Sequence, residues 1–277
     1  MSSTPLTARS TVSNESVMEM QQLVEYERGQ VIAFTECGDR DGYPILIQHG
    51  LIASIRDYGL FDRLVKAGAR VISIARPGYG DSSPYVMKHI GEWGRIVGVL
   101  VEELQLDQVD VLGMSSGAPY SYAIGYALPE RVRNIFIFSG TPALYDAQIV
   151  ARWPYPVDKT ASMSTLQQLA NDLFFANLSA EDVRRDDIRD SRMHDCFGIA
   201  QDFKLRCVDW GFGLAQVKPR VIMQHSRDDD QVPLVTAAMT AALLPTCRLE
   251  IREKGGHFSP ETLDGFLSSI VMEYLNS

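Results

Sequence analysis

A serine in a glycine-bounded turn is the strongest chemical signal in this sequence. Residues 113–117 read Gly-Met-Ser-Ser-Gly and fit the pattern G-x-S-x-G. They follow the apolar run 109–112, which predicts a buried strand, and they precede a segment with helical spacing. At such a strand-to-helix turn the serine takes strained backbone angles, and the residues two positions away must be small. The pattern therefore predicts Ser115 as a nucleophile.

A serine hydroxyl is a weak nucleophile near neutral pH, so it needs a base, and the base needs an orienting acid. His257 stands in a Gly-Gly-His-Phe loop, between an expected last strand at 248–252 and a C-terminal helix. This position predicts His257 as the general base.

The acid is expected after the strand that ends at His225. Residues 228–230 are three consecutive aspartates at this point of the chain. Spacing alone does not choose among the three carboxylates, and a plain solvated turn is an alternative interpretation of the run.

The elements that must position these residues alternate along the chain. Residues 23–27 and 30–37 predict an opening β-hairpin. Compact apolar runs, typical of strands buried on both faces of a parallel sheet, follow at 45–47, 71–75, 109–112, 135–138 and 221–223. Amphipathic helical stripes lie between them, at 90–104 and 123–128. The predicted fold class is therefore α/β, with a doubly wound and mostly parallel sheet.

The alternation breaks once, where helical patterns predominate from 141 to 217. This helical segment lies between two expected core strands. Its position predicts a helical cap at 141–217, inserted into a core formed by 21–140 and 218–277. The mixed charges from Glu181 to Arg192 predict a solvated helix face. Residues 1–20 predict a flexible N-terminal tail, with a transit peptide as the alternative.

Composition narrows the range of partners. Lys and Arg number 26 and Asp and Glu number 35, which gives a net charge of −9. This charge disfavours nucleic acids and anionic membranes as partners. The scattered cysteines predict reduced thiols in a cytoplasmic protein. No metal-ligand spacing and no dinucleotide-binding glycine motif stands out, so we expect a small-molecule substrate and neither metal nor cofactor. The oligomeric state has no sequence signal.

Taken together, these motifs resemble the α/β-hydrolase superfamily over nearly the whole chain. In that family the acid usually lies three residues before a Val-Pro pair, which here selects Asp229. The family's His-Gly after a strand is matched at 49–50, and its Gly-x-Gly-x-Ser turn at 78–82. One departure is visible: Ile74 replaces the aspartate often found two residues before the arginine of that turn.

The resemblance also implies an oxyanion hole, with the backbone N–H groups of Leu51 and Ser116 as its donors. His49 is then expected to support its loop rather than to act as a second base.

The expected function is a cofactor-free serine hydrolase that cleaves a small carboxylic ester through an acyl-enzyme. Three alternatives use the same triad: an aminopeptidase, an amidase and a carbon–carbon bond hydrolase. An aminopeptidase needs acids in the cap, for which Asp172, Asp195 and Asp209 are available. A small-ligand receptor with slow or no turnover is the alternative outside enzymes.

Overall fold

Eight strands form a single sheet in the computed structural model, which describes residues 21–275. The predicted tail at 1–20 lies outside the described residues. The sheet order is β1-β2-β4-β3-β5-β6-β7-β8, and only the pairings of β2 with β1 and β4 are antiparallel. The strands are β1 Gln22–Glu27, β2 Gln30–Gly38, β3 Tyr43–Gln48, β4 Ala69–Ile74, β5 Val109–Met114, β6 Val132–Phe138, β7 Arg220–Ser226 and β8 Cys247–Arg252. The predicted α/β class with a mostly parallel sheet is confirmed.

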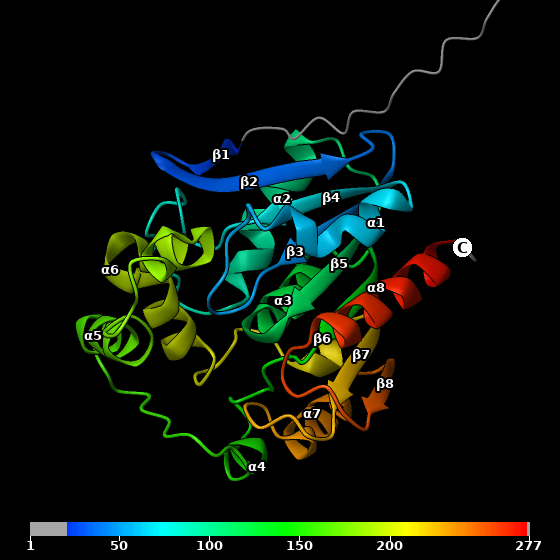
Figure 1. The fold of residues 1–277 in the computed structure, drawn as a ribbon. Coiled ribbons are helices and arrows are strands. Elements are labelled where there is room, and N and C mark those ends of the chain that lie inside the picture. Colours follow the sequence, from blue (N-terminus) through cyan, green and yellow to red (C-terminus); the bar gives the residue numbers. More distant parts are fainter. Residues whose placement is uncertain (1–20, 276–277) are drawn as a thin grey trace, which may run out of the picture.

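Helices cover both faces of this sheet. In Figure 1, α1 (Asp62–Lys66) and α8 (Pro260–Leu275) lie on the near face, with α2 (Glu92–Glu103) and α3 (Ala118–Ala127) behind it. The short α7 (Leu234–Ala241) joins the core layer of α2 and α3. Because both faces are covered, β5 is buried along its whole length. This double burial explains why its sequence, apart from Asp110, is apolar.

The segment between β6 and β7, residues 139–219, contains no strand and is called the insertion here. It holds α4 (Ala147–Val150), α5 (Met163–Phe174) and α6 (Asp186–Leu205). Helices α5 and α6 pack against each other to one side of the sheet (Figure 1). Helix α6 is bent, because three residues in its middle, 194–196, have positive φ angles. Single-turn 3₁₀ helices complete the chain at Tyr58–Phe61, Ser115–Gly117, Asp182–Arg184 and Leu214–Gln216.

The predicted solvated face of residues 181–192 is wrong at one position. Asp190 is only 3% exposed and forms an ion pair with Arg56 and a 2.5 Å hydrogen bond with Ser54 Oγ. Both partners lie in the loop after β3, so this carboxylate joins the insertion to the core. Sequence alone does not distinguish a charged side chain that faces water from one that pairs with a residue far away in the chain. Within residues 21–275, no helix combines the length and apolar character needed to cross a membrane.

Candidate active site

Three loops at the same edge of the sheet bring a serine, a histidine and an aspartate together. Ser115 Oγ lies 2.9 Å from His257 Nε2, and His257 Nδ1 lies 2.9 Å from Asp229 Oδ2. An ionised carboxylate only accepts, so the proton sits on Nδ1 and Nε2 is free to accept the serine proton. The residues predicted as nucleophile, base and acid therefore form one hydrogen-bonded series, in which His257 contacts the other two.

The serine sits at a tight turn between β5 and α3. Ser115 has φ of +49°, in the left-handed region that non-glycine residues rarely adopt. An added Cβ on Gly117 would lie 2.1 Å from Gln48 O, and one on Gly113 would lie 2.3 Å from Ser121 Oγ. Both positions therefore require glycine, as the G-x-S-x-G pattern predicts.

Asp229 is held by four donors, two of them imidazoles. Its Oδ1 accepts the N–H groups of Gln231 and Val232 at 2.9 and 2.8 Å, and its Oδ2 contacts both His257 and His225. Burial acts to raise the pKa of Asp229, but the hydrogen bonds from His225, His257 and Val232 outweigh it and hold the pKa well below the usual range. The carboxylate thus stays ionised throughout the physiological pH range.

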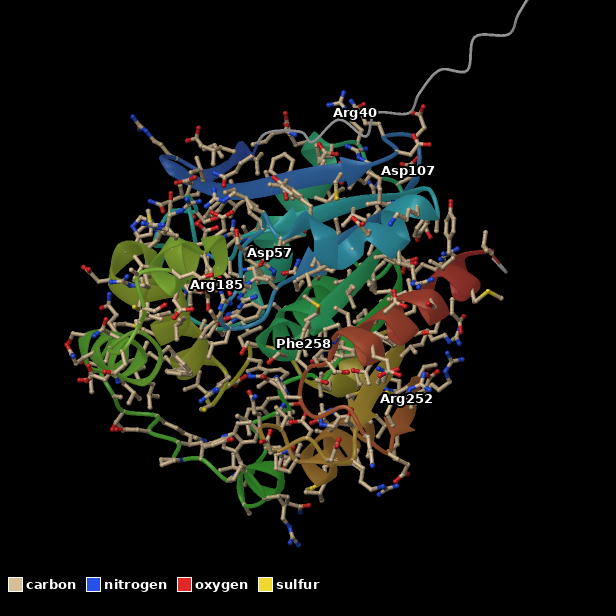
Figure 2. The ribbon with its side chains drawn as sticks, in the orientation of Figure 1. Arg40, Asp57, Asp107, Arg185, Arg252 and Phe258 are labelled. Atoms are coloured by element: carbon tan, nitrogen blue, oxygen red, sulfur yellow. The ribbon has the colours of Figure 1, made fainter. Side chains whose placement is uncertain are left out.

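The other two aspartates of the run have different surroundings. Asp228 accepts the N–H groups of Gly255 and Gly256 at 3.3 and 2.9 Å, so it anchors the loop that carries His257. Among residues 21–275, the hydrogen bond found for Asp230 uses its backbone carbonyl, which accepts the Tyr155 hydroxyl at 3.3 Å. Next to His257, Phe258 is half exposed near the end of the loop that leads to α8 (Figure 2). Its ring packs edge-on against that of Phe138.

Residues 49–51 follow β3 and include Leu51, whose N–H the family resemblance predicts as an oxyanion donor, so they are called the oxyanion loop here. Their carbonyl groups are held by nearby side chains. Arg76 donates to the carbonyl oxygens of His49 and Gly50 at 2.6 and 3.0 Å. The Tyr79 hydroxyl lies 3.0 Å from the carbonyl oxygen of Leu51. An added Cβ on Gly50 would lie 3.8 Å from the Ser115 Cβ, which places the loop beside the serine.

His49 forms hydrogen bonds with two backbone groups, and its ring packs edge-on against that of Tyr79 with the ring centroids 4.5 Å apart. Its Nε2 accepts the Arg76 N–H at 3.2 Å, so Nδ1 carries the proton and donates to Gly50 O at 2.8 Å. Complete burial, with the nearby Arg76 charge, holds the pKa of His49 well below its usual value. A neutral imidazole engaged at both nitrogens supports its loop.

Comparison with known proteins assigns the family. The sequence profile of the alpha/beta hydrolase family matches residues 45–266. The chain belongs to this family. It is therefore a hydrolase, built on the fold described above.

Named relatives of this hydrolase cover most of its length. A 2-hydroxy-6-oxononadienedioate/2-hydroxy-6-oxononatrienedioate hydrolase from Cupriavidus pinatubonensis is 24% identical over 258 residues, 84% of this chain and 86% of the relative. A protein of the same name from Escherichia coli is 26% identical over 267 residues, 88% of this chain and 90% of that one. Among solved structures, an esterase from Exiguobacterium antarcticum matches with a TM-score of 0.70 and 21% identity, covering 93% of this chain and 100% of that chain.

Sequence reasoning missed two groups behind Ser115, His257 and Asp229. His225 appeared only as the end of a strand, although a histidine four residues before the acid is a signal that could have been used. The second group is Asp202 on α6, which forms a buried ion pair with Arg76 at 2.6 Å. No local pattern marks Asp202, because its role depends on how the insertion packs against the core.

The acids considered for an aminopeptidase lie elsewhere. Asp172 accepts a hydrogen bond from Gln168 on the exposed side of α5. Asp195 is exposed at the bend of α6, and Asp209 accepts the Gly211 N–H in a surface hollow beside Tyr145. Within the described part of the chain, none of these acids contacts Ser115, His257 or Asp229, so the arrangement does not favour recognition of a substrate ammonium group.

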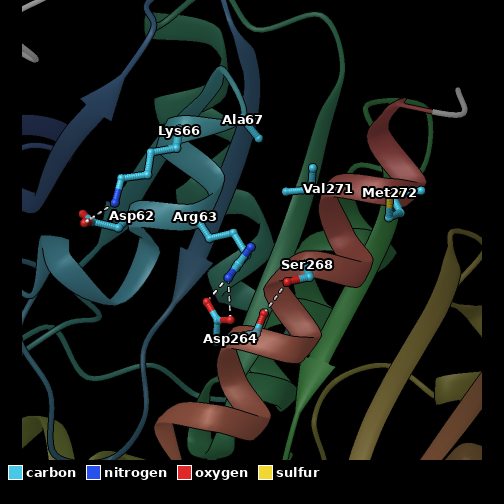
Figure 3. A pocket seen from close by; sticks show the side chains of 8 residues that line it. All are labelled: Asp62, Arg63, Lys66, Ala67, Asp264, Ser268, Val271 and Met272. Atoms are coloured by element: carbon cyan, nitrogen blue, oxygen red, sulfur yellow. Dashed lines mark hydrogen bonds and ion pairs between the residues drawn. The ribbon is translucent and has the colours of Figure 1, made fainter.

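The open groove between α1 and α8 does not form a second candidate site for a charged substrate (Figure 3). Its charges pair with each other: Arg63 binds Asp264 through two 2.6 Å contacts. Ser268 donates to the Asp264 carbonyl within α8. Among residues 21–275, no cluster of three His, Cys, Asp or Glu side chains is placed to hold a metal ion.

Proposed function

We propose that this hydrolase is a serine hydrolase that cleaves a small carboxylic ester without a cofactor. The observation that carries the proposal is the hydrogen-bonded series from Asp229 through His257 to Ser115, with 2.9 Å at each step. Ser115 attacks the substrate carbonyl while His257 takes its proton. Asp229 orients the imidazole and stabilises its cationic form.

The tetrahedral intermediate places negative charge on the former carbonyl oxygen. We assign its stabilisation to the backbone N–H groups of Leu51 and Ser116. In support, a planar trans peptide directs its N–H opposite to its C=O. The Gly50 carbonyl is held by Arg76, and the Ser115 carbonyl accepts the Thr141 N–H at 2.9 Å, so both following N–H groups face away from these partners.

His257 then protonates the leaving group, and the acyl-enzyme remains on Ser115. Water activated by His257 hydrolyses this ester and restores the free serine. Each step uses only groups of the chain, the substrate and water. A positioned pair of oxyanion donors contributes roughly 3 kcal/mol each to such a reaction.

A carbon–carbon bond hydrolase is the second candidate, because the relatives from Cupriavidus pinatubonensis and Escherichia coli carry names of that reaction class. Their dienedioate substrates have two carboxylates, which call for cationic partners. Arg76 is 1% exposed and is engaged by Asp202 and two carbonyl oxygens, so it is not offered to a substrate. Arg56 is paired with Asp190. This pairing favours a neutral ester.

The test is steady-state hydrolysis of p-nitrophenyl esters from acetate to palmitate, beside a 2-hydroxy-6-oxo-dienoate followed by loss of its absorbance. We expect ester turnover that disappears in Ser115→Ala. The matched control is Ser121→Ala. It removes a buried hydroxyl that donates to Gly117 O and contacts neither His225 nor His257. It should keep turnover within a few fold.

Three other results would change the assignment. Dienoate cleavage without ester cleavage would replace the ester by the second candidate. Labelling of Ser115 by a fluorophosphonate without turnover of any substrate would favour a receptor. Full ester turnover in Ser115→Ala would overturn the nucleophile itself.

A further inference from the structure

We propose that Asp202, on helix α6 of the insertion, is a positioning residue for the oxyanion loop and acts through Arg76. This inference rests on the proposed function, because the group it positions is the Leu51 N–H. It assigns the insertion a part in assembling the oxyanion hole, in addition to covering part of the core.

The first step is the buried ion pair. Arg76 and Asp202 are 1% and 4% exposed, and two guanidinium nitrogens reach the two carboxylate oxygens at 3.3 and 2.6 Å. The hydroxyl groups of Tyr120 and Tyr79 lie 2.6 and 2.9 Å from the same carboxylate. Both rings also flank the guanidinium, which lies within 5.0 Å of each ring centre. The geometry of Arg76 is thus fixed from several sides.

The second step leads from Arg76 to the oxyanion loop. Its remaining contacts are to the carbonyl oxygens of His49 and Gly50, at 2.6 and 3.0 Å. The Gly50 carbonyl and the Leu51 N–H belong to one planar peptide and point in opposite directions. Holding the carbonyl on the Arg76 side therefore turns the N–H to the other side. Within the described residues, the Leu51 N–H has no protein acceptor, as expected of a donor kept for a ligand.

The third step is the need for a counter-charge. A buried guanidinium without a carboxylate partner is strongly disfavoured, so an unpaired Arg76 would leave its place or the fold would loosen around it. Within residues 21–275, Asp202 is the one carboxylate that contacts Arg76. Ile74 occupies the position two residues before Arg76 and offers no charge. The insertion therefore supplies the partner that the core segment lacks.

The main experiment compares wild type with Asp202→Asn, using the full chain and a p-nitrophenyl ester. We expect kcat to fall about 100-fold, as when one oxyanion donor is lost, while KM changes less than about twofold. A trifluoromethyl ketone forms a tetrahedral adduct whose oxyanion occupies the same place. Its inhibition constant should rise by the factor by which kcat/KM falls.

The matched control is Asp190→Asn. Asp190 is also a buried α6 carboxylate in an ion pair that joins the insertion to the core, but its partners are Arg56 and Ser54 rather than the oxyanion loop. If ion pairs merely dock the insertion, both variants should lose turnover alike. The proposal requires Asp190→Asn to keep kcat and the ketone affinity within about threefold per folded protein.

Asp202→Asn leaves a buried charge and can fail to fold, so a second variant removes both charges. The double variant Arg76→Met with Asp202→Leu replaces the pair by apolar side chains of similar size, a change that is often neutral for stability. Without the donors to residues 49 and 50, its kcat should still fall about 100-fold. A folded double variant with wild-type kcat and ketone affinity would overturn the proposal.

Failure of the proposed function gives a different pattern. If the wild type cleaves no ester, the rate of Ser115 labelling by a fluorophosphonate replaces kcat, and the same ranking of variants is expected. If the wild type is neither labelled nor active, the serine mechanism and this inference fall together. If the wild type is active and Asp202→Asn matches it in kcat and ketone affinity, only the positioning role is wrong.

Discussion

The imidazole of His225 lies 3.2 Å from the same Asp229 oxygen that contacts His257. His225 is fully buried, and its Nε2 also lies 2.7 Å from the Val232 carbonyl oxygen. Both neighbours accept hydrogen bonds, so Nε2 carries a proton and is shared between them. The aspartate that orients His257 is therefore itself oriented by a second histidine from the end of β7.

Replacing His225 should weaken turnover through Asp229. In His225→Phe the carboxylate loses one charge-assisted hydrogen bond, and we expect kcat/KM to fall about tenfold, equivalent to about 1.4 kcal/mol. Glutamine can place an amide N–H near the position of Nε2, so His225→Gln should recover most of the loss. Ester kinetics at pH 8 provide the measurement. Equal activity of the Phe variant and wild type would show that the backbone N–H donors alone hold Asp229.

The three consecutive aspartates should separate cleanly by mutation. Asp229→Asn should lower kcat by about 10⁴-fold, since the amide favours the wrong histidine tautomer. Asp228→Ala removes the acceptor of the Gly255 and Gly256 N–H groups, so we expect a smaller loss, about tenfold, from a less ordered His257 loop.

Asp230→Asn is the control in that series. The Asp230 backbone carbonyl accepts the Tyr155 hydroxyl, and the substitution keeps this carbonyl, so the kcat of the variant should remain within twofold of wild type. An inactive Asp230→Asn beside an active Asp229→Asn would reverse the assignment of the acid.

Local sequence patterns predicted this fold well, because the burial of each strand or helix determines the spacing of its own apolar residues. The buried strand β5, the turn at Ser115 and helix α3 each follow from a few adjacent residues. The loop position of His257 and the run at 228–230 follow in the same way. The choice of Asp229 within that run came from a family resemblance, and the structure places it in contact with His257.

Contacts between distant segments could not be predicted in this way. Asp202 and Asp190 are single acids on a polar helix, and only the docking of α6 reveals that both are buried beside arginines of the core. Their partners lie 126 and 134 residues away in the chain. Such pairs depend on which faces of the insertion meet the core, and amphipathic spacing does not specify this docking.

The neutral state of His49 should appear in the pH dependence of stability. Its pKa is held well below 6.5 in the folded protein, while the unfolded chain takes up a proton below that pH. The unfolded state then binds more protons, so the free energy of unfolding decreases as the pH falls below 6.5. The stabilisation that comes from the neutral His49 is fully present above pH 6.5. By pH 5 we expect its loss to lower the free energy of unfolding by up to about 2 kcal/mol.

Urea unfolding of wild type and His49→Gln between pH 7.5 and 5 provides the measurement. The variant lacks this titration, so we expect it to be less stable at pH 7.5 and the difference between the two proteins to narrow on acidification. Other histidines are common to both proteins and cancel in the comparison. A difference that stays constant over this range would mean that His49 titrates alike in both states.

The glycine at the end of the serine turn should be far less replaceable than a helical glycine nearby. An added Cβ at Gly117 would meet the backbone oxygens of Gln48 and His49 at 2.1 and 2.8 Å, so Gly117→Ala must displace the end of β3. We expect a loss of about 2 kcal/mol or more in the free energy of unfolding. We also expect a reduced kcat, because the oxyanion loop directly follows the displaced end of β3.

The helical control is Gly98 in α2, where an added Cβ has only the Leu128 Cδ2 atom nearby, at an ordinary contact distance of 3.5 Å. Gly98→Ala should therefore gain about 0.5–1 kcal/mol from helix propensity and leave kcat unchanged. Equal stability of the two variants in urea unfolding would contradict the close approach of the turn to β3.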